Sequence, residues 1–105
     1  MAGRDEDWEA LATVVNFLDM IKRSKQPRPA MTGNVDGICV GSMTVGLAFL
    51  GPVALAMRKL SWTAERVGPR NWLMSTPENA HKEAVLLVED AKTGTVEAIL
   101  VHAAP

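Results

Sequence analysis

Two histidines, His81 and His102, are the residues of this sequence best suited to proton transfer. A histidine changes its charge near neutral pH, so a carboxylate within hydrogen-bond reach would complete an acid–base pair. If the last two apolar segments of the chain pair as a hairpin, Glu83 falls opposite His102. The acid–base candidate is therefore His102 with Glu83 or Glu89. We favour the alternative, in which these side chains form a solvated pair at the margin of a sheet.

The other residues that could carry catalysis or hold a metal do not form a known motif. Neither histidine has a second histidine or a cysteine at the spacing of a metal site, and one cysteine cannot form a Cys-based zinc site or an internal disulfide. That cysteine, Cys39, lies between Ile38 and Val40, which predicts a buried thiol rather than a nucleophile. No serine lies in a GxSxG elbow, and the glycines fit neither GxGxxG nor a P-loop. The sequence predicts no metal, no cofactor and no enzymatic activity.

The composition is that of one globular domain covering residues 1–105. Hydrophobic residues make up 48% of the chain and charged residues 22%, which excludes a wholly disordered chain. Eleven Lys and Arg residues against 12 Asp and Glu residues give a net charge of −1. The basic excess typical of nucleic-acid binding is therefore missing, and no nucleic-acid partner is expected. Residues 1–7 carry three acids, which is unlike the start of a secretory signal, so we expect a cytoplasmic domain.

The central question is what residues 38–57 form. These 20 residues contain no charge, and about 20 apolar residues suffice to span a bilayer as one helix. A single-pass membrane accessory protein is therefore one interpretation. Only eight of the 20 residues are Leu, Ile, Val or Phe, and glycines and a proline interrupt the run. This composition weakens the membrane interpretation. We favour a hairpin that turns at Gly41–Ser42, followed by a helix that starts at Pro52.

Apolar periodicity predicts two main helices. Apolar residues at three- and four-residue steps predict a helix over residues 5–25, which ends before Pro27. Pro52 at the first helical position and Gly68 just past the last one predict a second helix over residues 52–67. The stripe of this second helix that faces the core is expected to be Val53, Met57, Leu60, Ala64 and Val67.

The remaining segments predict strands. Alternating residues predict a first hairpin within residues 35–50, and Val-, Leu- and Ile-rich segments predict a second over residues 84–102, around a turn at Asp90–Gly94. Residues 71–74 suit a short strand, and residues 76–83 a single helical turn. The expected fold class is α+β: a two-layer domain with an antiparallel four-stranded sheet and two main helices, in the order helix, hairpin, helix, hairpin.

The second predicted helix carries the strongest candidate for a partner-binding surface. Leu55 and Trp62 lie seven residues apart, on the side away from the core stripe. Arg58 and Arg66 flank Trp62 at four residues on either side, and aromatic residues with arginines are typical of interface hot spots. We predict a small non-enzymatic interaction or regulatory module that forms a homodimer or binds another protein. The residues expected to bind the partner are Leu55, Arg58, Trp62 and Arg66, together with an apolar face of the last hairpin.

A third interpretation is a soluble domain that binds a small ligand. Its pocket would lie between a helix and the sheet, because methionine and aromatic side chains of this sequence are expected there. The lining residues would be Met43, Met57, Trp62 or Trp72.

Overall fold

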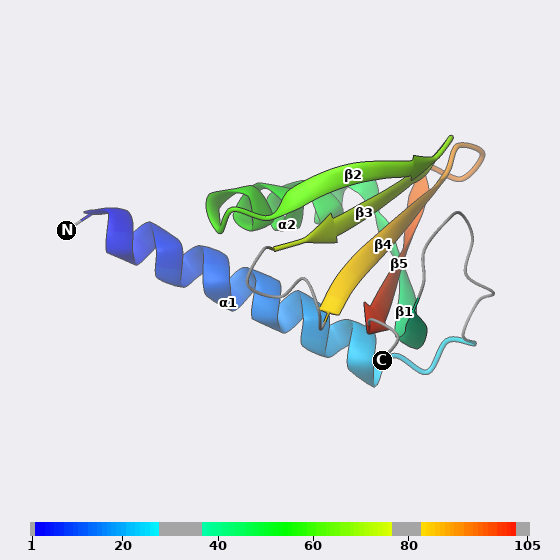
Figure 1. Cartoon of the computed structure of the whole chain (residues 1–105), viewed down its shortest axis with the longest axis horizontal. Coiled ribbons are helices and arrows are strands. Elements are labelled where there is room, and N and C mark those ends of the chain that lie inside the picture. The colour runs from blue at the N-terminus through cyan, green and yellow to red at the C-terminus, as the bar shows by residue number, and fades with distance from the viewer. Residues whose placement is uncertain (1, 28–36, 77–82, 103–105) are drawn as a thin grey trace.

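The chain folds as an α+β domain with two helices and one antiparallel sheet (Figure 1). The computed structural model describes residues 2–27, 37–76 and 83–102, without the side chains of residues 2–7. In chain order the elements are α1 (Ala2–Arg23), β1 (Ile38–Gly46), α2 (Leu47–Lys59), β2 (Thr63–Gly68), β3 (Asn71–Ser75), β4 (Glu83–Asp90) and β5 (Thr95–His102).

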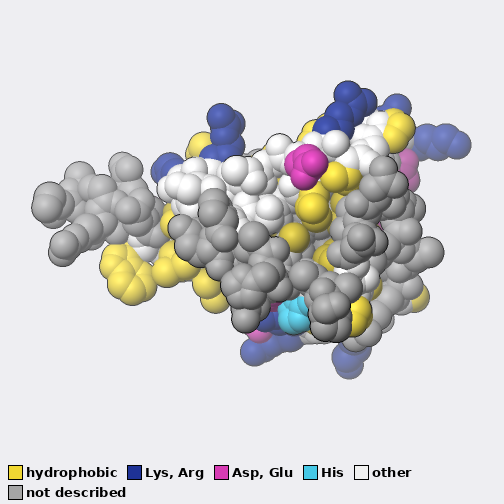
Figure 2. Space-filling view, in the orientation of Figure 1, with side chains coloured by type: hydrophobic (Ala, Val, Ile, Leu, Met, Phe, Trp, Pro, Cys, Tyr) yellow, Lys and Arg dark blue, Asp and Glu magenta, His cyan; other side chains and the backbone are white. Residues whose placement is uncertain are grey.

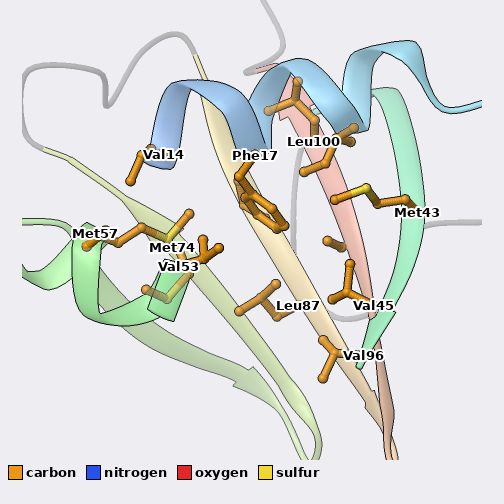
Figure 3. Close-up of a cluster of buried hydrophobic side chains, with 14 of the residues drawn as sticks. Val14, Phe17, Met43, Val45, Val53, Met57, Met74, Leu87, Val96 and Leu100 are labelled. Atoms are coloured by element: carbon orange, nitrogen blue, oxygen red, sulfur yellow. The ribbon is translucent and has the colours of Figure 1, made fainter. Parts of the chain in front are cut away.

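The sheet has the strand order β1-β5-β4-β3-β2, so β1 and β2 are its two edges. All four neighbouring pairs are antiparallel. Both helices pack on one face of the sheet, and α1 contacts α2, β1 and β5. Figure 3 shows their apolar side chains meeting those of the strands in a single layer.

The main core lies between the helices and this face of the sheet. Helix α1 contributes residues at steps of four, three and four, which is the spacing of one helical stripe. Phe17 and Ile21 of this stripe are almost completely buried. The strands contribute alternate residues, as the pleat of a strand requires. The buried members of the core are Ala10, Val14, Phe17, Ile21, Met43, Val45, Val53, Ala56, Met57, Met74, Val85, Leu87, Val96, Ala98 and Leu100.

The other face of the sheet carries a smaller apolar cluster. Leu86, Ile99 and Val101 form it, and each is buried within the chain itself. The last hairpin was expected to offer one apolar face to a second layer or a partner. These three side chains are therefore buried within the chain, and the role of that face in binding a partner stays a prediction.

The expected sheet of four strands is wrong, since the structure has five strands in a different order. The expected hairpin at Gly41–Ser42 is instead the middle of β1, which continues through both residues after a β-bulge between Cys39 and Gly41. Gly41 lacks the positive φ of a tight-turn glycine, and a Cβ on it would lie 2.5 Å from the carbonyl oxygen of Ile21. The glycine is therefore needed for the close approach of α1 to β1, and not for a turn.

Helix α2 begins five residues earlier than predicted, at Leu47, and continues through Pro52. A proline inside a helix has no N–H to donate, so the carbonyl of Ala48 has no intrahelical partner. Ala48 and Pro52 are both exposed, so water can satisfy that carbonyl. The single helix over residues 38–57 that the membrane interpretation requires is not formed, because this segment divides between β1 and α2. Neither helix in the described part of the chain is long and apolar enough to cross a bilayer.

The predictions for the first helix, the short strand and the last hairpin are confirmed. Helix α1 covers most of the expected range, and β3 covers residues 71–75. In the last hairpin Asp90 pairs with Thr95, and its carboxylate accepts a hydrogen bond from the N–H of Lys92. Gly94 takes the left-handed conformation expected there, with a φ of 67°. The helical turn expected over residues 76–83 falls largely outside the described residues.

Substitution of Gly41 tests the seating of α1 on β1. Gly41→Ala should lower the free energy of unfolding by about 1–3 kcal/mol, because the added methyl group must push backbone away. Gly46→Ala is the matched control in the same strand, since a Cβ there meets nothing within 4 Å. Its effect should stay within about 0.5 kcal/mol. Urea unfolding measures both, and equal stabilities of the two variants would contradict the close approach.

Candidate functional site

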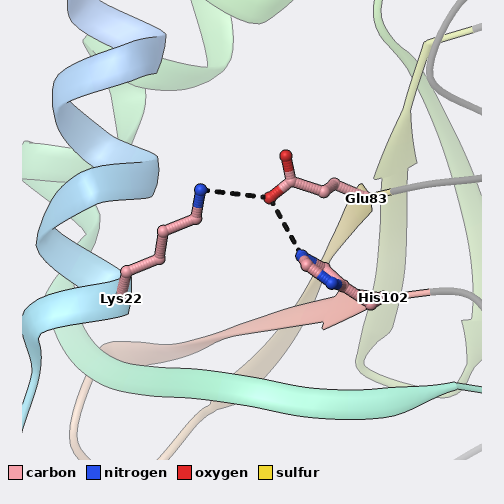
Figure 4. Close-up of polar contacts among 3 residues, drawn as sticks. All are labelled: Lys22, Glu83 and His102. Atoms are coloured by element: carbon pink, nitrogen blue, oxygen red, sulfur yellow. Dashed lines mark hydrogen bonds and ion pairs between the residues drawn. The ribbon is translucent and has the colours of Figure 1, made fainter.

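The histidine and glutamate named from the sequence do come together, at the end of the sheet opposite the β4–β5 turn. Glu83 and His102 are directly paired in the register of β4 and β5, as predicted. His102 Nε2 lies 3.2 Å from Glu83 Oε2 and donates to it in the tautomer that carries the proton on Nε2. Lys22 Nζ of α1 lies 3.4 Å from the same oxygen (Figure 4). The cluster thus joins the last turn of α1 to two strands.

This cluster is open to solvent. The side chains of Lys22 and His102 are each 46% exposed and that of Glu83 is 23% exposed, so water screens their charges. The hydroxyl of Ser42 and the thiol of Cys39, both in β1, bond to backbone carbonyls. Ser42 Oγ lies 3.3 Å from the carbonyl oxygen of Pro27, and Cys39 Sγ lies 3.6 Å from that of Gly41. The geometry therefore favours a solvated ion pair over a catalytic set.

The other titratable candidates do not extend this cluster. Glu89 lies near the opposite end of β4, where it pairs with Val96, so it cannot reach His102. His81 falls outside the described residues. Among the residues that the structure describes, no group of three or more His, Cys, Asp and Glu side chains could hold a metal ion.

The predicted arginine–tryptophan ladder is not formed, because α2 ends at Lys59 rather than at residue 67. The N–H of Trp62 bonds to the carbonyl of Met57 at 2.9 Å, and the N–H of Ser61 bonds to that of Arg58 at 3.1 Å. Ser61 has a φ of 67°. These bonds and this left-handed residue are the Schellman termination of a helix. Trp62 is the residue that follows it, half-buried against the main core.

The four predicted partner-binding residues therefore separate into three environments. Leu55 and Arg58 are exposed on α2, one turn apart. Trp62 lies beyond the helix and packs on the core. Arg66 lies on the edge strand β2, where its guanidinium donates to the carbonyl oxygens of Gly68 and Pro69. Only Leu55 and Arg58 share one surface, and their role in binding a partner stays a prediction.

Of the four residues predicted to line a small-ligand pocket, two are buried and two are half-buried. Met43 and Met57 are buried members of the main core. Trp62 packs against the same core, and Trp72 is half-buried in β3. The small-ligand interpretation stays a prediction.

The structure shows an apolar surface that the sequence interpretation missed. Of the eight large hydrophobic residues that are exposed in the described part of the chain, seven lie on the two helices. Figure 2 shows hydrophobic side chains gathered along the described part of α1, at the lower left. The sequence did contain a signal for this surface. The apolar residues of the first helix fill about half of its circumference, whereas one packed face needs only roughly 100°, so some of them had to stay exposed. We call this set the helical apolar surface: Trp8, Leu11, Val15 and Met20 of α1 with Leu47, Phe49 and Leu55 of α2.

A groove between α1 and α2 is lined by two residues of this surface, Met20 and Phe49. It has a volume of about 470 Å³. The ring of Phe49 at its wall lies 6.2 Å from that of Phe17, which belongs to the core beneath. A smaller hollow of about 140 Å³ continues between the helices toward Leu55 and Lys59. The larger groove is lined by Thr13, Asn16, Phe17, Met20, Ala48, Phe49, Pro52 and Val53.

Comparisons with known protein families, with curated proteins and with solved structures found no match to this chain. Any functional argument therefore has to start from the two features described above, the Glu83 cluster and the helical apolar surface.

Removal of the Glu83 carboxylate tests how much the cluster contributes. Glu83→Gln should lower the free energy of unfolding by no more than about 1 kcal/mol, because partly exposed ion pairs contribute little. Arg23→Gln is the matched control. It breaks the exposed Asp19–Arg23 ion pair on α1, the helix that also carries Lys22. Chemical unfolding of both variants provides the measurement. If Glu83→Gln alone lowered the free energy of unfolding by several kcal/mol, water would not be screening the cluster, and this prediction would be wrong.

Replacement of Ser61 tests the termination of α2. Ser61→Gly should raise the free energy of unfolding by about 1 kcal/mol, because glycine adopts a positive φ without the steric cost that a side chain brings. Ser75→Gly, in β3, is the control and should lower stability instead. The melting temperatures of the two variants should therefore shift in opposite directions from that of the wild type. A fall in melting temperature for Ser61→Gly would contradict the left-handed conformation.

Proposed function

We propose that this chain is a non-enzymatic interaction module that forms a homodimer through the helical apolar surface. The observation that carries the proposal is the concentration of exposed large hydrophobic residues on the two helices, seven of the eight in the described part of the chain. Single exposed hydrophobics are ordinary on a protein surface, whereas a concentration of them on neighbouring elements is typical of a site of interaction. The groove between α1 and α2 adds the concave shape into which an anchor residue can fit.

The composition of this surface suits a protein partner. It includes Trp8 and Phe49, and aromatic residues are enriched where interfaces bury their centres. Arg58 is exposed one helical turn from Leu55, which places a charge beside the apolar surface, as in the polar rim of an interface. Leu55 and Arg58 are therefore kept as partner-binding residues, and Trp62 and Arg66 are not part of the proposed surface.

An enzymatic role has less support from the same geometry. The pair of Glu83 and His102 is partly exposed, and Ser42 and Cys39 of β1 bond to backbone carbonyls. A catalytic acid or base is usually held in a cleft. The groove described above lies elsewhere, between the helices. The ion pair therefore fits a structural link between α1 and the sheet.

Sedimentation velocity over a concentration series tests the proposed dimer. The wild-type chain should sediment as a dimer, and Leu55→Asp should raise its dissociation constant at least about tenfold, which corresponds to about 1.4 kcal/mol. The carboxylate would have to lose its water in the interface, which is the physical reason for the loss.

Ile38→Asp is the matched control. Ile38 is 59% exposed, close to the 55% of Leu55, but lies on β1 rather than on a helix. This variant should dimerise like the wild type. A wild-type chain that stays monomeric throughout the series would overturn the proposed function, as would equal effects of the two substitutions.

A further inference from the structure

The groove between α1 and α2 is shaped and lined to receive one apolar side chain. Met20 and Phe49 form walls that are themselves partly exposed, and Pro52 forms part of the rim. Phe17 and Val53, which line it from below, are buried in the main core, so the groove rests on fixed packing. Its volume of about 470 Å³ is ample for a single aromatic ring system.

Among the large hydrophobic side chains that the structure describes, Trp8 has the least contact with the rest of the chain. It is 70% exposed, more than any other large hydrophobic residue in the described part of the chain. A tryptophan has a large apolar area and one N–H, so exposing it to water on a helix is costly unless it docks elsewhere. The stripe of α1 that packs on the sheet passes through Val14 and leaves Trp8 pointing away.

We propose that the indole of Trp8 fills the groove between α1 and α2 of a second copy of this chain, reciprocally, in a two-fold dimer. The inference rests on the proposed homodimer and names its anchor. At about 100° per residue, Trp8 and Asn16 lie only about 80° apart, on the side of α1 turned away from the core. A two-fold axis midway between Trp8 and the groove exchanges the two positions. Both grooves are then filled at once, as an isologous interface requires.

The charge pattern of α1 supports a second copy as the occupant. In the sequence, four of the five residues from 5 to 9 are acidic, and three of the four residues from 22 to 25 are basic. Glu9 and Arg23 are both exposed. The groove lies along the later half of α1, so placing Trp8 over it brings the acidic end of one helix near the basic end of the other. Opposite charges attract across such an interface and fix its orientation.

The lining of the groove also suits an indole. Phe49 and Met20 can contact its ring, because aromatic pairs and sulfur–aromatic contacts are both favourable. Asn16 lines the groove and carries an amide oxygen that can accept the indole N–H. The indole N–H of Trp8 therefore exchanges its hydrogen bond to water for one to Asn16.

Two single variants and their mixture test this reciprocal plug. Trp8→Ala removes the indole and leaves the groove intact. Met20→Glu places a carboxylate in the wall of the groove and leaves the indole of Trp8 in place. Each should raise the dissociation constant of the homodimer at least about 30-fold, the loss expected for an interface hot spot. Mixing the two variants restores one intact contact, since Trp8 of the Met20→Glu chain can enter the groove of the Trp8→Ala chain. The mixture should therefore associate more tightly than either variant alone.

Sedimentation velocity measures all three samples, with circular dichroism to confirm that each variant is folded. Ile38→Ala is the control on β1 and should dimerise like the wild type. A wild-type dimer that neither variant weakens would overturn the plug and leave the proposed function standing. A dimer weakened by Trp8→Ala but not by Met20→Glu, or a mixture without recovery, would also overturn it. A monomeric wild type would overturn both proposals.

Discussion

The close seating of α1 on the sheet is the constraint on which the rest of this structure depends. Ile21 is fully buried, and its carbonyl oxygen lies so near Gly41 that no side chain fits between helix and strand. This contact sets which stripe of α1 faces the core. The same rotation of the helix leaves Trp8, Leu11 and Val15 in solvent. The exposed apolar residues are thus a direct consequence of how the core is packed.

The end of α2 is the second determinant of the surface. Ser61 reverses the chain in a left-handed conformation, so the following residues enter the sheet as β2 instead of prolonging the helix. The reversal draws Trp62 against the core and leaves α2 short, beside α1. Helices α1 and α2 contact each other on one face of the sheet. The groove between the two helices is the space that remains.

The two candidate sites of this protein differ in what they can do. The cluster of Lys22, Glu83 and His102 ties the end of α1 to the ends of two strands through water-screened charges. The helical apolar surface has area, concavity and aromatic residues, which are the properties that protein association exploits. The first feature stabilises the arrangement of α1 on the sheet, and the second is created by it. The second feature is the basis of the proposed binding function.

Local patterns in the sequence were sufficient to determine α1, the last hairpin and its register. The pairing of Glu83 with His102 followed from that register, because strand residues alternate with a period of two and the turn at Asp90–Gly94 sets the offset. Tertiary contact decided the rest. Gly41 was indistinguishable from a turn glycine until α1 lay against it, and Ser61 carries no sequence signal of a left-handed helix end. Which apolar half of α1 would be buried was likewise set by the partners packed against it, since periodicity shows that a helix is amphipathic but not which residues another layer covers.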